Sequence, residues 1–143
     1  LILRGLRTAE VRMRQHETNA LQVARWLQQQ PEVRSVLHPG LPEHPQHERF
    51  KRDFSGSSGL FSFELEAGTS DAAISALVNH REHFGIGYSW GGFESLIMPA
   101  NISTGRTAHP WTGGQLIRLH IGLEDPASLI ADLDQGFAAM RRA

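Results

Sequence analysis

Cysteine is absent from this chain of 143 residues, and the sequence contains a single lysine, Lys51, and a single tyrosine, Tyr88. The lack of thiols excludes a disulfide scaffold, a cysteine-bound iron–sulfur cluster and a cysteine nucleophile. No run of about 18 apolar residues occurs, so we expect no membrane-spanning helix. Fourteen basic and fifteen acidic residues give a net charge of −1, which provides no general attraction to nucleic acid or anionic lipid.

The first 30 residues predict one long helix, because apolar side chains recur there at spacings of three and four. Pro31 is expected to end it, since proline lacks a backbone N–H. Two further helices are predicted, one over residues 71–80 after Ser70 as N-cap and one after Asp125-Pro126. The apolar positions of the first and last helices are Leu6, Ala9, Met13, Ala20, Val23, Ala24 and Leu27, interrupted at His16, and Leu129, Ile130, Leu133, Phe137 and Met140.

Strands are predicted over residues 33–37, 60–66 and 116–121. In the second of these, Phe61, Phe63 and Leu65 alternate with polar residues, as in a strand with one buried face. The proline- and glycine-containing stretch 39–58 is expected to be a surface loop with one helical turn at residues 46–52. The order of elements predicts an α+β fold, an antiparallel sheet with helices packed on one face, in a single domain spanning residues 1–143.

A first candidate functional segment is the run from Phe84 to Ser95, where four glycines fall within eight residues around Tyr88-Ser89-Trp90. Glycine allows positive φ and a close approach of the backbone to a ligand. The segment lacks the pattern of a phosphate-binding loop. A ligand-facing loop and a glycine-rich hairpin with a packed tryptophan both fit this pattern.

A second candidate is Arg118, which lies within the apolar strand Leu116-Ile117-Arg118-Leu119-His120-Ile121. The period of two places Ile117, Leu119 and Ile121 toward the helices and Arg118 on the opposite face. A guanidinium in such a strand requires an anion or water, and its fork matches a carboxylate. The alternative is an Arg118 that is exposed or paired with an internal acid.

Neither a metal site nor a serine nucleophile is favoured by the sequence. Without cysteine or an H-E-x-x-H motif, the histidines are expected to be solvated loop residues and not zinc ligands. Ser89 lacks the G-x-S-x-G context of a hydrolase nucleophile. The histidines weighed for zinc are His38, His44, His47, His80 and His83.

Three segments together form a recognisable pattern: Leu3-Arg4-Gly5-Leu6-Arg7-Thr8, the run Tyr88 to Leu96, and the run Leu116 to Asp125. They resemble the C-terminal domain of the cystathionine β-lyases, which are Cys/Met-metabolism enzymes dependent on pyridoxal 5'-phosphate (PLP) with the aspartate-aminotransferase fold, fold type I. The resemblance covers essentially the whole chain. The related γ-synthases and γ-lyases usually carry Glu-Ser-Leu-Gly-Gly where this chain has Tyr88-Ser89-Trp90-Gly91-Gly92.

The resemblance implies PLP as cofactor, bound by an N-terminal domain to which nothing here corresponds. Lys51 lies in a polar Lys-Arg-Asp setting, which is unlike the pocket of a Schiff-base lysine. We therefore expect the C-terminal domain of a longer carbon–sulfur lyase, inactive by itself. The implied reaction of the whole enzyme is α,β-elimination of cystathionine to homocysteine, pyruvate and ammonia.

The resemblance also implies residue roles. Arg118 binds the substrate α-carboxylate with help from the backbone at Trp90, Ser89 hydrogen-bonds near the catalytic lysine, and Tyr88 lines the distal part of the substrate pocket. The implied partners are the PLP-binding N-terminal domain, an amino-acid thioether and further copies in a homotetramer. A cytoplasmic location and a place in methionine biosynthesis are implied as well, without nucleic acid, membrane or metal.

Two other functions stay open at this point. One is another trans-sulfuration enzyme, a cystathionine γ-synthase or γ-lyase, and the other is a non-catalytic binding or structural module. If the chain is the C-terminal domain of a longer enzyme, the face that bears Arg118 and Trp90 should be open in the isolated chain. The apolar residues Leu1, Leu3 and Leu6 should then lack partners or lie in a contact between chains.

Overall fold

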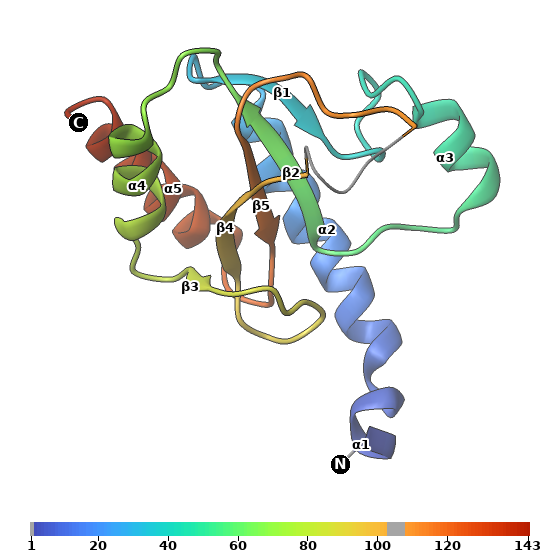
Figure 1. Cartoon of the computed structure of the whole chain (residues 1–143). Coiled ribbons are helices and arrows are strands. Elements are labelled where there is room, and N and C mark those ends of the chain that lie inside the picture. Colours follow the sequence, from blue (N-terminus) through green and yellow to red (C-terminus); the bar gives the residue numbers. More distant parts are fainter. Residues whose placement is uncertain (1, 103–107) are drawn as a thin grey trace.

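The computed structural model describes residues 2–102 and 108–143. In this part of the chain five strands form one sheet in the order β1-β2-β5-β4-β3 (Figure 1). All neighbours are antiparallel except β3 and β4, which are parallel. The strands are β1 (Val33–Leu37), β2 (Leu60–Leu65), β3 (Gly85–Ile86), β4 (Leu96–Ala100) and β5 (Leu116–His120).

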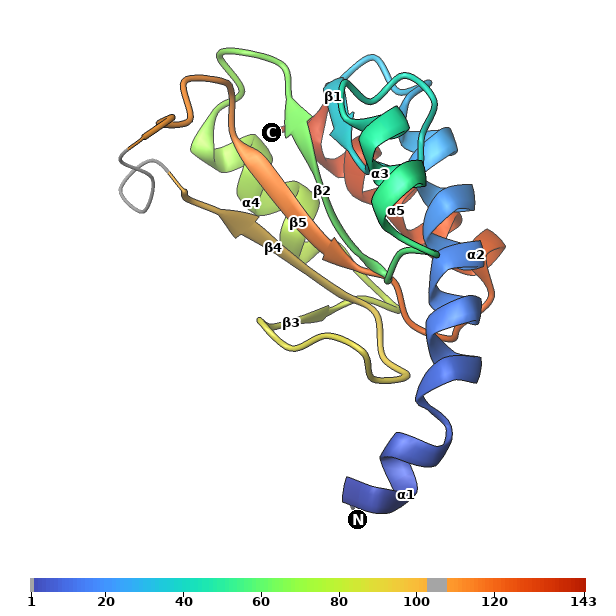
Figure 2. The same ribbon diagram turned by 90° about the vertical axis from the view of Figure 1, so that its right-hand side faces the viewer.

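The helices are α1 (Ile2–Arg7), α2 (Ala9–Leu27), α3 (His47–Asp53), α4 (Asp71–Asn79) and α5 (Pro126–Met140). Helices α4 and α5 and the C-terminal half of α2 pack on one face of the sheet (Figure 2). Phe63, Ile117 and Leu119 face these helices and are fully buried. The α+β class with helices on one face is therefore confirmed. None of the helices in residues 2–102 and 108–143 has the length and apolar character needed to cross a membrane.

The prediction of one helix over residues 1–30 is wrong near both of its ends. The chain breaks at Thr8, which has φ −108° and ψ 5°, between α1 and α2. The Arg12 guanidinium stabilises this break by bonding to the Gly5 carbonyl, at 2.9 Å, and to the Thr8 hydroxyl. At the other end α2 stops at Leu27, before Pro31, because the amides of Gln29 and Gln30 already form tighter i→i−3 bonds.

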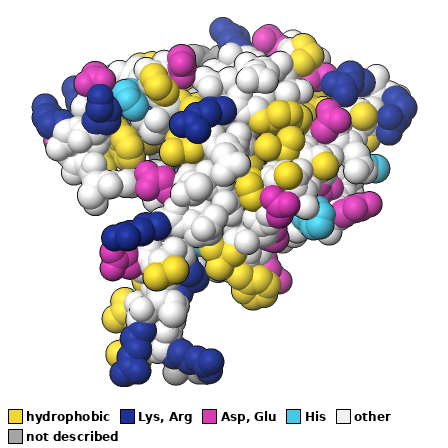
Figure 3. Space-filling view, turned by 180° about the vertical axis from the view of Figure 1, so that it is seen from behind, with side chains coloured by type: hydrophobic (Ala, Val, Ile, Leu, Met, Phe, Trp, Pro, Cys, Tyr) yellow, Lys and Arg dark blue, Asp and Glu magenta, His cyan; other side chains and the backbone are white. Residues whose placement is uncertain are grey.

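Helix α1 projects from the body of the molecule (Figure 1). Leu3 and Leu6 are 62% and 69% exposed, whereas Leu1 lies outside the described residues. Basic side chains gather at the end of this projection (Figure 3), where the helix carries Arg4 and Arg7.

The sequence did not predict β4 and β3. Pro99 sits inside β4, and proline is usually excluded from a central strand because it cannot donate a ladder hydrogen bond. The short β3 pairs only with Leu96 and Ile97. The outer side of β4 therefore needs no N–H from residue 99.

Two predicted caps are confirmed, and one predicted exposure is wrong. Ser70 accepts the Ala73 amide at 3.1 Å, and Asp125 accepts the Ala127 amide at 3.0 Å. Glu64, expected on the solvent side of β2, is 6% exposed. Its carboxylate is satisfied within the fold, since it accepts the Gly114 amide at 2.7 Å and the Ser35 hydroxyl at 2.8 Å.

Candidate functional site

Arg118 lies in the middle of β5, on the sheet face opposite the helices. It stands across from Ser62 of β2 and Met98 of β4. Its Nη2 donates to the carbonyl oxygen of Tyr88 at 2.9 Å, and its Cζ lies 6.0 Å from the centre of the Tyr88 ring. Its Nη1 lies 4.0 Å from the Met98 sulfur. The half-buried guanidinium thus has one oxygen acceptor among residues 2–102 and 108–143.

No acidic side chain in the described residues forms an ion pair with Arg118. Glu124, an acidic residue close to Arg118 in the sequence, binds Ser95 instead. It accepts the Ser95 amide at 2.7 Å and the Ser95 hydroxyl at 2.8 Å. Glu94, the acidic residue of the loop before β4, is exposed. Among the residues that the structure describes, the charge of the half-buried Arg118 is therefore not compensated by an acid.

The residues Tyr88, Ser89 and Trp90 lie in the loop between β3 and β4, and all three are exposed. Tyr88 and Trp90 are 77% and 57% exposed. Only Tyr88 of the three contacts Arg118, through its carbonyl and its ring. The structure therefore places this aromatic segment beside Arg118 and open to a ligand or to another protein surface.

The loop is fixed to the sheet by residues that the sequence analysis did not single out. The Gly91 amide donates to Nε2 of His120 at 3.1 Å, and Nε of Arg12 donates to the Gly91 carbonyl at 3.3 Å. Gly91 has φ +78°, which explains the need for glycine at this position. The period-two pattern did place His120 on the face of Arg118, but a contact spanning 79 residues, as between Arg12 and Gly91, leaves no local signal.

Two buried histidine rings pack together beneath this loop. His16 of α2 and His120 of β5 are edge to face, with centroids 5.1 Å apart. Burial lowers the pKa of His120 below its ordinary value of 6.5. Burial and the neighbouring imidazole likewise lower the pKa of His16. Both rings are therefore neutral at physiological pH.

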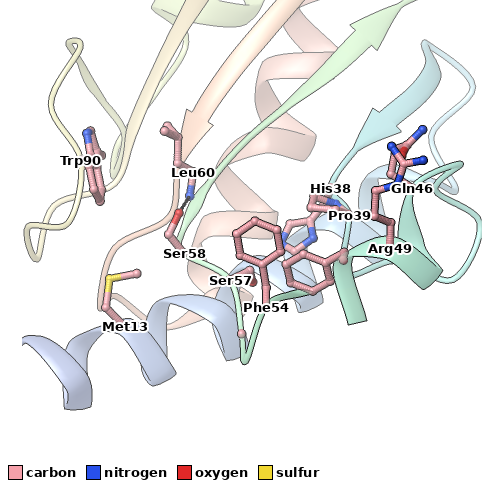
Figure 4. A pocket seen from close by; sticks show the side chains of 12 residues that line it. Met13, His38, Pro39, Gln46, Arg49, Phe54, Ser57, Ser58, Leu60 and Trp90 are labelled. Carbon is pink, nitrogen blue, oxygen red and sulfur yellow. Dashed lines mark hydrogen bonds between the residues drawn. The ribbon is translucent and has the colours of Figure 1, made fainter. Parts of the chain in front are cut away.

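A cavity of about 510 Å³ opens next to Trp90, between α2, the segment around α3 and the start of β2 (Figure 4). Met13, Phe54 and Leu60 contribute apolar walls. Phe50 of α3 and Phe54, which directly follows this helix, stack with ring centroids 5.6 Å apart, and Phe54 is 63% exposed. The i,i+4 spacing of these two phenylalanines inside the predicted loop was the available signal for this apolar surface.

The expectation of solvated loop histidines is wrong for His38, which is 1% exposed. Its ring packs edge to face on Phe61 at 5.3 Å, and its Nδ1 accepts the Gly40 amide at 3.0 Å. His47 bonds to the Pro39 carbonyl at 2.9 Å. Among the residues that the structure describes, no group of three or more His, Cys, Asp and Glu is arranged to hold a metal ion.

The family profile described as "Cys/Met metabolism PLP-dependent enzyme" matches residues 1–138. The chain belongs to this family. The cystathionine beta-lyase of Haemophilus influenzae is 51% identical over 138 residues, which cover 94% of this chain and 35% of that protein. A protein of Wolbachia pipientis named L-alanine/L-glutamate racemase is 45% identical over 139 residues, covering 96% of this chain and 34% of that protein.

Solved structures of the Cys/Met-metabolism family share the fold. A crystal structure of cystathionine gamma synthase from Xanthomonas oryzae, in complex with cystathionine, matches with a TM-score of 0.82 and 37% identity. The match covers 98% of this chain and 37% of that one. This agreement confirms the expected PLP fold type I domain. The chain spans about a third of the length of the relatives it matches.

The residues of this chain do not fit PLP as a cofactor that it binds by itself. Such enzymes hold PLP through a lysine amine in a desolvated pocket. Lys51, the only lysine, lies on α3 with 57% of its side chain exposed and pairs with Glu48 at 3.3 Å. We therefore derive the role of this chain from its own side chains alone.

Proposed function

We propose that this chain is the C-terminal, carboxylate-binding domain of a PLP-dependent carbon–sulfur lyase that acts on cystathionine. The observation that carries the proposal is the half-buried guanidinium of Arg118, which has no acidic partner among residues 2–102 and 108–143 and lies beside the exposed Tyr88. The resemblance of the Tyr88–Leu96 run to the β-lyases and 51% identity to one of them support the choice of reaction.

Arg118 anchors the substrate in this proposal. Its remaining N–H donors point away from the core, because Ile117 and Leu119 occupy the helix side of β5. A guanidinium fork binds a carboxylate through two parallel hydrogen bonds, which fix both the position and the direction of the substrate. Holding the α-carbon in one orientation lowers the entropic part of the reaction barrier.

The loop supplies the rest of the proposed site. The backbone at Trp90 assists in carboxylate binding, and the exposed Tyr88 ring lines the distal part of the substrate pocket. Ser89 hydrogen-bonds near the catalytic lysine of the N-terminal domain. All three residues face outward in the structure, as a surface that meets another domain requires.

The proposed partners are a PLP-binding N-terminal domain of the same enzyme and further copies in a homotetramer. We also propose a cytoplasmic location and a role in methionine biosynthesis. The exposed apolar residues Leu3 and Leu6 of α1 support a covering partner, since leucines of a projecting helix are seldom left in water. Alone, the chain is proposed to be inactive because it lacks a lysine suited to the cofactor.

The test is a product assay. Residues 1–143 with added PLP and cystathionine should release no pyruvate, whereas the full-length protein should release pyruvate and homocysteine. Pyruvate from residues 1–143 would contradict the proposed inactivity. Release of cysteine and a four-carbon keto acid by the full-length protein would instead identify a γ-lyase.

A different product would point to another member of the family. The Wolbachia pipientis protein named as a racemase is 45% identical, so L-alanine belongs in the same assay. Racemised alanine without pyruvate would replace the lyase proposal. No turnover of any of these substrates by the full-length protein would favour the non-catalytic module.

A further inference from the structure

We propose that His120 is a positioning residue that holds the Trp90–Gly91 turn beside Arg118 and must be neutral to do so. This inference rests on the proposed carboxylate-binding function. His120 is 1% exposed and contacts no bulk solvent, so it acts through the loop and not on the substrate.

The hydrogen-bond geometry assigns the ring its chemical form. The Gly91 amide can only donate, so Nε2 of His120, 3.1 Å away, must accept. A neutral imidazole with an accepting Nε2 carries its proton on Nδ1. A protonated ring would present an N–H to the Gly91 N–H and lose this bond, and Nε2 would instead donate to the Gly92 carbonyl, 3.4 Å away.

The bond to Gly91 controls the backbone at Trp90. Because a peptide unit is planar, fixing the Gly91 N–H also fixes the direction of the Trp90 carbonyl. On the other side of the same residue, Arg12 donates to the Gly91 carbonyl. The positive φ of Gly91 then places the turn in one conformation.

Arg118 and His120 hold the same loop from the same face of β5. Arg118 donates to the Tyr88 carbonyl at 2.9 Å, and His120 accepts from Gly91. A carboxylate would bind the donors of Arg118 that the Tyr88 carbonyl leaves free. The His120–Gly91 bond holds the turn from β5 without using any donor that the carboxylate needs.

The surroundings of His120 keep it neutral. His16 faces it from α2 with Arg12 beside that ring, Arg118 lies on its own strand, and Glu124 lies in the connection to α5. The Gly92 carbonyl and Glu124 favour the charged ring, but the carbonyl lies 3.4 Å from Nε2 and the Glu124 carboxylate is occupied by Ser95. Burial outweighs both and lowers the pKa of His120.

The test uses the PLP-loaded full-length protein and measures KM and kcat for cystathionine. His120→Phe keeps a ring but removes the acceptor, and should raise KM up to about tenfold with kcat nearly unchanged. His120→Gln, whose side-chain oxygen reaches the place of Nε2, should restore KM. His38→Phe is the matched control, because it removes a buried imidazole that accepts a different glycine amide.

The pH profile keeps the proposal testable if His120→Phe does not fold. Between about pH 8 and pH 5, the wild-type KM should rise on the acid side as His120 takes up a proton. His120→Gln should lack this rise. A rise of equal size in His120→Gln overturns the inference.

Arg118→Ala, measured in parallel, separates the two proposals. If Arg118→Ala raises KM and His120→Phe does not, His120 has no positioning role and the carboxylate-binding function stands. If His38→Phe raises KM as much as His120→Phe, the effect is general destabilisation and the inference fails. An unchanged KM in Arg118→Ala overturns the proposed function, and the inference with it.

Discussion

Arg118 and Asp132 show how differently this fold treats two charged side chains. Asp132 of α5 is 3% exposed and accepts the amides of Glu82, His83 and Phe84, at 2.8, 2.8 and 3.2 Å. Arg118 has one oxygen acceptor, the Tyr88 carbonyl, within the part of the chain that the structure describes. A carboxylate saturated by backbone donors is structural, whereas a guanidinium with free donors is available to a ligand.

Asp132→Asn should therefore lower stability. An amide presents one oxygen and one NH2 group to three N–H donors, so at least one buried donor loses its partner, at about 1–3 kcal/mol. Urea unfolding of the chain measures this loss. Asp134→Asn, an exposed position on the same helix, is the control and should leave the midpoint unchanged. Equal midpoints for the two variants would contradict a structural role for Asp132.

At the scale of elements, the predictions from sequence succeeded where the pattern is local. Alternation identified β2 and β5, and the caps at Ser70 and Asp125 marked the starts of α4 and α5. Strand β4 was missed because proline is rarely found in a central strand. Pro99 is accommodated because β3 pairs only with Leu96 and Ile97, which no local pattern in the sequence reveals. The two hydrogen bonds that hold Gly91 in place, one from Arg12 and one to His120, were missed for the same reason, since both residues are distant from Gly91 in sequence.

The loop before β4 contains two neighbouring glycines, Gly91 and Gly92, that allow a matched test of these hydrogen bonds. Gly91 has φ +78°, and Gly92 does not have a positive φ, while a Cβ at either would meet open space. Gly91→Ala should cost roughly 1 kcal/mol through backbone strain and should raise the KM of the full-length enzyme. Gly92→Ala should change neither quantity. Stability and kinetics measured on both variants check this, and identical behaviour of the two would contradict it.

At the scale of the whole molecule, three buried histidines connect stability to pH. His16, His38 and His120 are at most 1% exposed, and burial lowers the pKa of each below 6.5. Below that value the unfolded chain binds more protons than the folded one, so the free energy of unfolding falls as the pH falls. Above it both states are neutral at these positions, and the contribution is fully present.

The melting temperature of the chain should therefore decrease from about pH 7.5 to pH 5. His38→Gln removes one of the titrating groups and should flatten this dependence, even though it lowers stability at neutral pH. His109→Gln, at an exposed position, should leave the dependence as it is. A melting temperature that does not depend on pH in this range would show that the buried rings take up protons without cost.

The central claim is that Arg118 binds the carboxylate of the substrate. Arg118→Ala in the full-length enzyme tests it most directly, when KM and melting temperature are measured together. Loss of a charge-assisted, two-point contact with the carboxylate should cost about 2–4 kcal/mol of substrate binding, with little change in melting temperature. Arg118→Lys should recover part of this loss, because an ammonium cannot reproduce the fork. A lower melting temperature with an unchanged KM would contradict the account and make Arg118 a structural residue.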